Sequence, residues 1–128
     1  MWNEDWVINT KMTQCEMTPE VQTYLDEKLD AISKLVVVGD ADAKVTCDVE
    51  IEKTQSQQHG PIWRAEMNLS FEGNMYRAEA TAESINAALD EVKDEMTKRL
   101  RRDKKKRFDM IRRGGAKMKE WMRFGRRE

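Results

Sequence analysis

The chain has 128 residues, of which 39% are hydrophobic, and its formal net charge is −1. This length suits one domain with a short appendage, and the absence of any apolar run of roughly 18 residues excludes a predicted transmembrane helix. Residues 1–7 lack the pattern of a secretion signal, and the two cysteines, Cys15 and Cys47, fit a reducing compartment, so we expect a cytoplasmic protein.

The near-neutral net charge is the sum of two opposite blocks. Residues 1–97 carry 8 Lys and Arg against 20 Asp and Glu, whereas residues 98–128 carry 15 against 4. Such an asymmetry points to a nucleic-acid or membrane partner for the basic block. We expect the acidic body to repel nucleic acid from most of its surface and so to orient the basic block on its target.

The first two predicted elements are a strand and a helix. Residues 6–12 alternate between apolar and polar side chains, which predicts the strand. Thr18 and Pro19 mark the start of the helix, because threonine caps the first turn and proline is tolerated at the first helical position. The apolar residues that follow recur at spacings of three and four and predict about five turns, ending before Gly39. They are Val21, Tyr24, Leu25, Leu29, Ile32 and Leu35.

Three further strands are predicted as an antiparallel meander. Residues 44–53 alternate strictly, which makes Cys47 a core side chain. Residues 54–61 predict a polar loop, residues 62–72 alternate again, and Gly73-Asn74 predicts a hairpin turn into a strand at residues 75–81. The outer face of this meander should be acidic and should repel RNA, with Arg64 as its minority cation. Its acidic residues are Asp48, Glu50, Glu52, Glu66 and Glu72.

A second helix is predicted to begin near residues 82–84, with an apolar stripe that ends at Leu100. Asp103 and Lys104 fall at the next stripe positions, so the helix would continue to about residue 111 as a solvated rod and break at residues 114–115. Residues 116–124 predict a short amphipathic helix. The fold class is therefore α+β, in β-α-β-β-β-α order, with both helices on one face of a four-stranded sheet. We divide the chain into a domain at residues 1–107 and a basic, aromatic tail at residues 108–128.

No motif for catalysis, for a metal or for a cofactor is present in the sequence. The one histidine, His59, lies in the polar loop, and there is no glycine-rich phosphate loop, Cys-x-x-Cys pair, His-Glu-x-x-His run or nucleophile elbow. The carboxylates fall on predicted outer faces, where they serve solubility. The sequence therefore predicts no enzyme, no cofactor, no metal and no small-molecule substrate, and a small hydrolase with paired carboxylates is the least favoured alternative.

The strongest candidate site is the run at residues 98–107, which holds eight cations in ten residues. On a helix these cations would cover nearly the whole circumference and repel one another unless a polyanion offsets the repulsion. The alternative is a solvated, partly frayed tail. Arg112, Arg113 and the residues up to Arg127 mix arginine with aromatic side chains, a combination that suits unpaired RNA bases and phosphates. A protein groove or a membrane surface could accept the same segment.

Three stretches of the sequence resemble the ribosome hibernation promoting factor and ribosome-associated inhibitor family, as a short form. They are residues 16–35 (Glu-Met-Thr-Pro-Glu-Val and the positions behind it), residues 76–79 (Tyr-Arg-Ala-Glu) and residues 84–104 (Ser-Ile-x-Ala-Ala-Leu-Asp and the basic positions behind it). The resemblance implies binding to the small ribosomal subunit, through 16S rRNA, between its head and body. There the protein would cover the mRNA channel and the A- and P-site tRNA positions and silence idle ribosomes under stress.

The resemblance also implies particular RNA contacts. Matching positions on the two helices are Lys28, Lys34, Lys98, Arg101, Arg102 and Lys104, and Arg77 is a weaker match on the last strand. The charge pattern adds Arg99, Lys105, Arg112 and Arg113. Gln22, Thr13 and Glu95 stand where the family usually has basic residues. The predicted function is a steric translation silencer without a membrane partner, and the alternative is a general double-stranded RNA-binding module.

Overall fold

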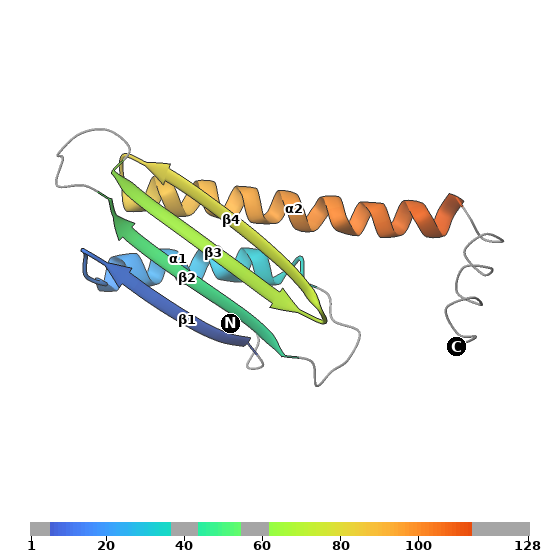
Figure 1. Ribbon diagram of the computed structural model, residues 1–128, viewed down its shortest axis with the longest axis horizontal. Coiled ribbons are helices and arrows are strands. Elements are labelled where there is room, and N and C mark those ends of the chain that lie inside the picture. The colour runs from blue at the N-terminus through green and yellow to red at the C-terminus, as the bar shows by residue number, and fades with distance from the viewer. Residues whose placement is uncertain (1–5, 37–43, 55–61, 114–128) are drawn as a thin grey trace.

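In the computed structural model, six elements follow one another in the predicted β-α-β-β-β-α order (Figure 1). The structure describes residues 6–36, 44–54 and 62–113, and for residues 107–113 the backbone only. Residues 55–61 of the predicted loop and the predicted helix at residues 116–124 lie outside this part of the chain. The elements are β1 (Trp6–Thr13), α1 (Pro19–Ser33), β2 (Val45–Lys53), β3 (Trp63–Phe71), β4 (Asn74–Ala82) and α2 (Ile85–Arg113).

The four strands form one sheet in the order β1-β2-β3-β4. β1 runs parallel to β2, whereas β2, β3 and β4 are antiparallel neighbours, so the predicted meander is confirmed. The parallel pair needs a crossover, which contains α1. Both helices lie on the same face of the sheet, behind it in Figure 1, as the two-layer argument predicts.

The core lies between the sheet and the two helices. Val45, Cys47, Val49 and Ile51 of β2 are at most 3% exposed, which confirms the predicted inner face of that strand. Burial raises the pKa of the Cys47 thiol to about 12, so the thiol stays protonated and unreactive at neutral pH. The helices contribute the opposite side of the core, chiefly through Leu25, Leu29, Ile32, Leu89, Val92 and Met96.

Helix α1 begins where predicted but ends earlier. The Val21 N–H donates to Thr18 Oγ1 at 3.1 Å, which confirms the N-cap. The prediction of five turns is wrong by about one turn, because the helix stops at Ser33. The N–H groups of the next residues bond to oxygens three residues back, which tightens the chain out of the α-helix. Leu35 still packs against the core, but from this tightened turn.

The hairpin turn between β3 and β4 is Glu72-Gly73, one residue earlier than predicted. Asn74 is already paired with Phe71 as the first residue of β4. Both turn residues have positive φ, 48° at Glu72 and 80° at Gly73, as a two-residue turn of the I′ type requires. Glu72 therefore lies in the turn and not on the outer sheet face, where the alternation had placed it.

Gly73→Ala should lower the free energy of unfolding by about 1–2 kcal/mol, because a Cβ disfavours the left-handed conformation. A Cβ at this position would meet no atom within 4 Å, so the loss is conformational and not steric. Gly73→Asn is the matched control and should retain most of the stability, since asparagine tolerates this conformation. Urea unfolding followed by circular dichroism measures both variants, and equal losses would contradict the conformational argument.

Candidate nucleic-acid interface

Helix α2 is longer than the sheet that supports it. Its 29 residues span about 43 Å, whereas a nine-residue strand spans about 30 Å. Among the described side chains of α2, the last buried one on its inner face is Leu100, at 4% exposure. The C-terminal end of the helix extends past the sheet, at the right of Figure 1. Its cations are thereby presented to solvent on more than one side.

Polar contacts hold α2 at both ends of its packed part. Ser84 Oγ accepts a hydrogen bond from the Ala87 N–H at 3.0 Å and caps the helix. At the other end, the Tyr76 hydroxyl of β4 donates to the Asp103 carboxylate, and the Tyr76 ring stacks on Phe71 with 5.7 Å between centroids. Asp103 was predicted to lie on a solvated rod. The hydrogen bond to β4 instead holds this turn of α2 against the sheet.

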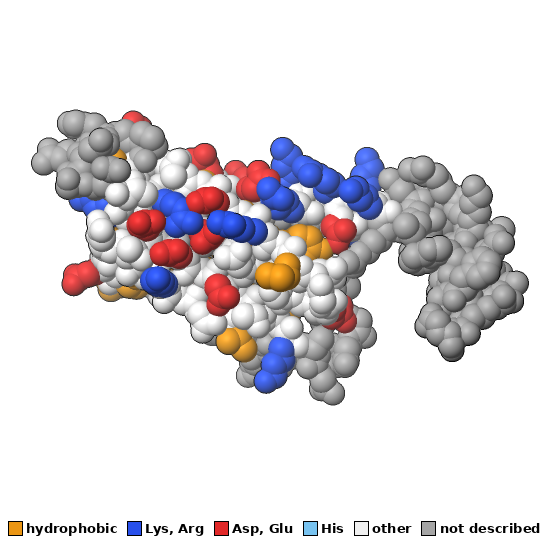
Figure 2. Space-filling model, in the orientation of Figure 1, with side chains coloured by type: hydrophobic (Ala, Val, Ile, Leu, Met, Phe, Trp, Pro, Cys, Tyr) orange, Lys and Arg blue, Asp and Glu red, His pale blue; other side chains and the backbone are white. Residues whose placement is uncertain are grey.

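Three cations define what we call the outer ridge of α2: Lys98, Arg101 and Lys105. Their spacings of three and four residues place them on one side of the helix, and all three are exposed. None of them forms an ion pair with another described residue. Figure 2 shows Lys and Arg side chains gathered over this half of the helix. Lys104 is exposed on the same part of α2.

A second basic row is offset by one residue from the outer ridge and lies on the side of α2 that faces β4. It consists of Arg99, Arg102 and Lys106, and only Arg99 has an ion pair within the described residues, to Glu95 at 3.0 Å. Lys106 was not predicted as a site residue, although its spacing from Arg99 and Arg102 was a usable signal. The row lines a hollow of about 200 Å³, the β4–α2 groove, together with residues of β4. The lining residues are Met75, Tyr76, Arg77, Arg99, Arg102, Asp103 and Lys106.

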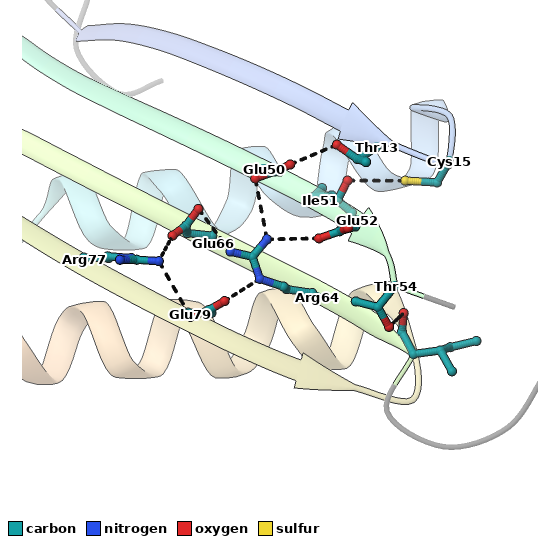
Figure 3. A network of polar contacts seen from close by, with 11 residues as sticks. Thr13, Cys15, Glu50, Ile51, Glu52, Thr54, Arg64, Glu66, Arg77 and Glu79 are labelled. Atoms are coloured by element: carbon teal, nitrogen blue, oxygen red, sulfur yellow. Dashed lines mark hydrogen bonds and ion pairs between the residues drawn. The ribbon is translucent and has the colours of Figure 1, made fainter. Parts of the chain in front are cut away.

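The outer sheet face is organised around Arg64 (Figure 3). Its guanidinium pairs with carboxylates from three strands, and the strongest of these contacts, with Glu79, raises the pKa of Arg64 above its ordinary value. Arg77, a predicted RNA contact, pairs with two carboxylates of the same network, so four carboxylates face two guanidiniums. The predicted acidic face is thus confirmed. The partners of Arg64 are Glu50 at 3.5 Å, Glu52 and Glu66 at 3.2 Å each, and Glu79; those of Arg77 are Glu66 and, at 3.8 Å, Glu79.

The two predicted cations of the α1 region have different surroundings. Lys28 Nζ lies 2.8 Å from the Asp90 carboxylate of α2 and 4.4 Å from the Tyr24 ring centroid, and the Tyr24 hydroxyl donates to the same carboxylate at 2.6 Å. Lys28 therefore ties the two helices together. Lys34 follows the end of α1, with 74% of its side chain exposed and Asp30 at 3.7 Å, so it remains available to a partner.

Asp90→Asn should lower the free energy of unfolding at neutral pH by at most about 1 kcal/mol, because the pair with Lys28 is partly exposed. The hydrogen bonds from Lys28 and Tyr24 hold the pKa of Asp90 below its ordinary value. This contribution is therefore complete above the unfolded-state pKa and is lost as the pH falls through the folded-state pKa. Urea unfolding at neutral pH and at about pH 3 measures the difference from the unchanged protein, which should narrow in acid. An undiminished difference in acid, or an equal effect of Glu91→Gln on the exposed side of α2, would contradict this.

The remaining predicted contacts lie where no side chain is described. Arg112 and Arg113 belong to the last turn of α2 by their backbone, and residues 114–128 are outside the described part of the chain. Their RNA contacts stay predictions. Within the described residues, no group of three or more His, Cys, Asp and Glu side chains is placed to hold a metal ion. None of the described helices is long and apolar enough to cross a membrane.

Comparisons with known proteins give a family for most of the chain and two solved structures of similar fold. Residues 8–107 match the protein family described as sigma 54 modulation protein / S30EA ribosomal protein. The Protein Y N-terminal domain from Thermus thermophilus has a similar fold, with a TM-score of 0.59, 20% identity, and coverage of 75% of this chain and 97% of that one. A ribosomal subunit interface protein from Coxiella burnetii gives a TM-score of 0.58, 11% identity, and coverage of 76% and 96%. No curated protein sequence matches the chain significantly.

Proposed function

Since this chain belongs to the sigma 54 modulation protein / S30EA ribosomal protein family, we propose that it binds the small ribosomal subunit at the decoding cleft and silences translation sterically. The folded body would occupy the mRNA channel and the A- and P-site tRNA positions of cytoplasmic ribosomes. Cations of α2 would bind the phosphates of 16S rRNA. A neighbour of the same fold is described as a ribosomal subunit interface protein, which supports a ribosomal partner.

The outer ridge is the observation that carries the RNA part of this proposal. Its three cations have no ion-pair partner among the described residues, and neighbouring like charges on a helix destabilise it. Phosphates would supply the missing countercharge. The sheet presents the opposite sign on its outer face, around Arg64 and its four carboxylates. RNA is therefore attracted to α2 and repelled from this acidic patch, which favours one orientation of the body in the cleft.

Steric silencing needs a body that keeps its shape in the cleft. The contact between Lys28 and Asp90 joins the two helices, and the hydrogen bond from Tyr76 to Asp103 joins α2 to the sheet. These ties lie beside a continuous apolar core that both helices share with the sheet. The body therefore excludes mRNA and tRNA by occupying their volume, and α2 serves as its attachment to rRNA.

Sucrose-gradient co-sedimentation of the full chain with vacant small subunits tests this function. We expect the protein in the subunit fraction at low salt, its release as the salt concentration rises, and its displacement by an mRNA fragment together with a P-site tRNA. Protein that stays at the top of the gradient at low salt would overturn the proposal. Comparable affinity for a bare RNA hairpin would instead favour a general double-stranded RNA-binding module.

A further inference from the structure

We propose that the β4–α2 groove is a second RNA site, which holds the sugar-phosphate backbone of one strand while the outer ridge holds another part of the RNA. This inference rests on the proposed function, because it specifies how the same partner is held. The two surfaces lie on different sides of α2. RNA bound to both surfaces would therefore contact α2 on two sides and fix the rotation of α2 about its own axis.

The charge of the β4–α2 groove favours a polyanion. Four cations line it, and Asp103 is the one carboxylate among its described lining residues; that carboxylate accepts a hydrogen bond from the Tyr76 hydroxyl. The lining residues therefore carry a formal net of three positive charges, and two of the four cations, Arg77 and Arg99, are also paired with carboxylates outside the groove. Arg102 and Lys106 have no ion pair with any described residue. Because Arg77 comes from β4 and the other cations from α2, the groove is a concave site built by two elements.

The length of the basic row favours a strand over a single phosphate group. From Arg99 to Lys106 the helix rises about 10 Å, which is longer than one phosphate group. The three cations of the row can therefore face about two or three successive phosphates of one strand. Glu79 and Glu95 stand beside Arg77 and Arg99 in the adjoining hollow and end the positive track there. A bound strand should consequently run from this end toward the free end of α2.

Met75 adds an apolar contact to the β4–α2 groove. Its side chain is 76% exposed, and Val7 is the one other large hydrophobic residue exposed among the described residues. A flexible thioether adapts to irregular apolar surfaces. Beside a row of phosphate-binding cations, it suits a ribose or the face of an unpaired base. The groove thus offers cations for the phosphates of a single RNA strand and an apolar side chain for a ribose or a base.

A matched pair of triple variants tests the groove against the outer ridge. The groove variant combines Arg99→Gln, Arg102→Gln and Lys106→Gln, and the ridge variant combines Lys98→Gln, Arg101→Gln and Lys105→Gln. Both remove three charges from the same helix at the same spacing. We expect the groove variant to leave small subunits at lower salt, with the slope of log affinity against log salt shallower by about 2. Cooperative thermal unfolding followed by circular dichroism will show that both variants fold.

The outcomes separate the inference from the proposed function. If the groove variant binds like the unchanged protein and only the ridge variant weakens binding, the groove site is overturned and the proposed function stands. If the unchanged protein itself fails to bind subunits, both fall. If the groove variant loses affinity with a shallower salt slope, the groove contacts phosphates.

Photocrosslinking identifies the occupant of the groove. With p-benzoylphenylalanine in place of Met75, we expect crosslinks to rRNA in the bound complex, and none from the same group in place of Val7 on the opposite edge strand. Inorganic pyrophosphate, added as a free-polyphosphate probe, should not remove the crosslink while the protein stays bound. Loss of the crosslink under that condition, or equal crosslinking from position 7, would overturn the RNA-strand assignment.

Discussion

Replacing the outer ridge by glutamine, as Lys98→Gln, Arg101→Gln and Lys105→Gln together, should weaken binding to the small ribosomal subunit by about two orders of magnitude at about 0.1 M salt. Each phosphate contact releases close to one counterion, so three lost contacts should flatten the slope of log affinity against log salt by about 2 to 3. Glutamine keeps a long side chain and a high helix propensity, so the backbone of α2 should be unaffected. Co-sedimentation or filter binding across a salt series measures both quantities.

The same variant should unfold at an equal or slightly higher temperature. In the free protein, Lys98 and Arg101 are like-charged neighbours at a spacing of three, and Arg101 and Lys105 at a spacing of four. Each such pair destabilises a helix by about 0.2–0.5 kcal/mol. A variant that loses both binding and stability would indicate misfolding, and one that keeps full binding would show that the ridge does not contact RNA. Loss of binding with retained stability is the expected signature of a surface that requires a polyanion.

The strands were predictable because strict alternation of apolar and polar side chains is typical of a half-buried strand. The alternation at Val45, Cys47, Val49 and Ile51 assigns every side chain of β2 to a face, and the structure buries those four. The acidic outer face followed from the same alternation. Register depends on the pairing as well, which is why Glu72 was misplaced. Glycine can occupy either position of a two-residue turn, and the pairing of Asn74 with Phe71 decides between them.

The end of α1 was not predictable from periodicity. Leu35 continues the apolar spacing of the helix, and it contacts the core whether the last turn is helical or tightened. Whether the last turn is helical or tightened is decided by the backbone hydrogen bonds to the carbonyl oxygens of Ile32 and Ser33. The pattern of apolar side chains does not reveal these bonds. The start of the same helix was predictable, because its cap is a side-chain hydrogen bond between neighbours in sequence.

For the candidate site, the positions of the cations could be predicted from the sequence, but their ion-pair partners and neighbouring elements could not. The run at residues 98–107 predicted an exposed basic helix, and the described part of it is exposed at every cation. Its division into an outer ridge and a β4–α2 groove depends on β4 lying beside α2. Likewise, Lys28 finds Asp90, and Arg77 finds Glu66, across the fold. Sequence spacing alone does not reveal such pairings within the protein, and the RNA contacts of these two cations stay predictions.

Arg64→Met should lower the free energy of unfolding by about 2–3 kcal/mol at neutral pH, more than any other single change on the outer sheet face. The pairing register places Glu50 directly opposite Glu66, and Glu66 directly opposite Glu79. Like charges in directly opposed positions destabilise a sheet by about 0.2–1 kcal/mol for each pair. Arg64 offsets this repulsion by contacting carboxylates of all three strands, and it is only 19% exposed. Its removal also eliminates four ion pairs, each worth up to about 1 kcal/mol.

The loss should depend on pH with a definite sign. In the unchanged protein, the hydrogen bond from Thr13 and then the nearby cations, Arg64 among them, hold the pKa of Glu50 below its ordinary value. That contribution is present above the unfolded-state pKa and is lost as the pH falls through the folded-state pKa. In the variant, protonation of Glu50 relieves its repulsion with Glu66, which lies directly opposite. The difference between the two proteins should therefore be complete above about pH 5 and should narrow toward about pH 3.

Urea unfolding of Arg64→Met and its controls at these two pH values decides what the residue contributes. Arg64→Lys should lose an intermediate amount, because an ammonium cannot present donors to several carboxylates as a guanidinium fork does. Arg77→Met should lose less than about 1 kcal/mol, since its side chain is 62% exposed and it contacts two carboxylates. A loss for Arg64→Met that is the same at both pH values would assign the effect to packing of the arginine stem. A loss that narrows in acid assigns it to charge, and then Arg64 stabilises the outer sheet face by bridging the carboxylates of its three strands.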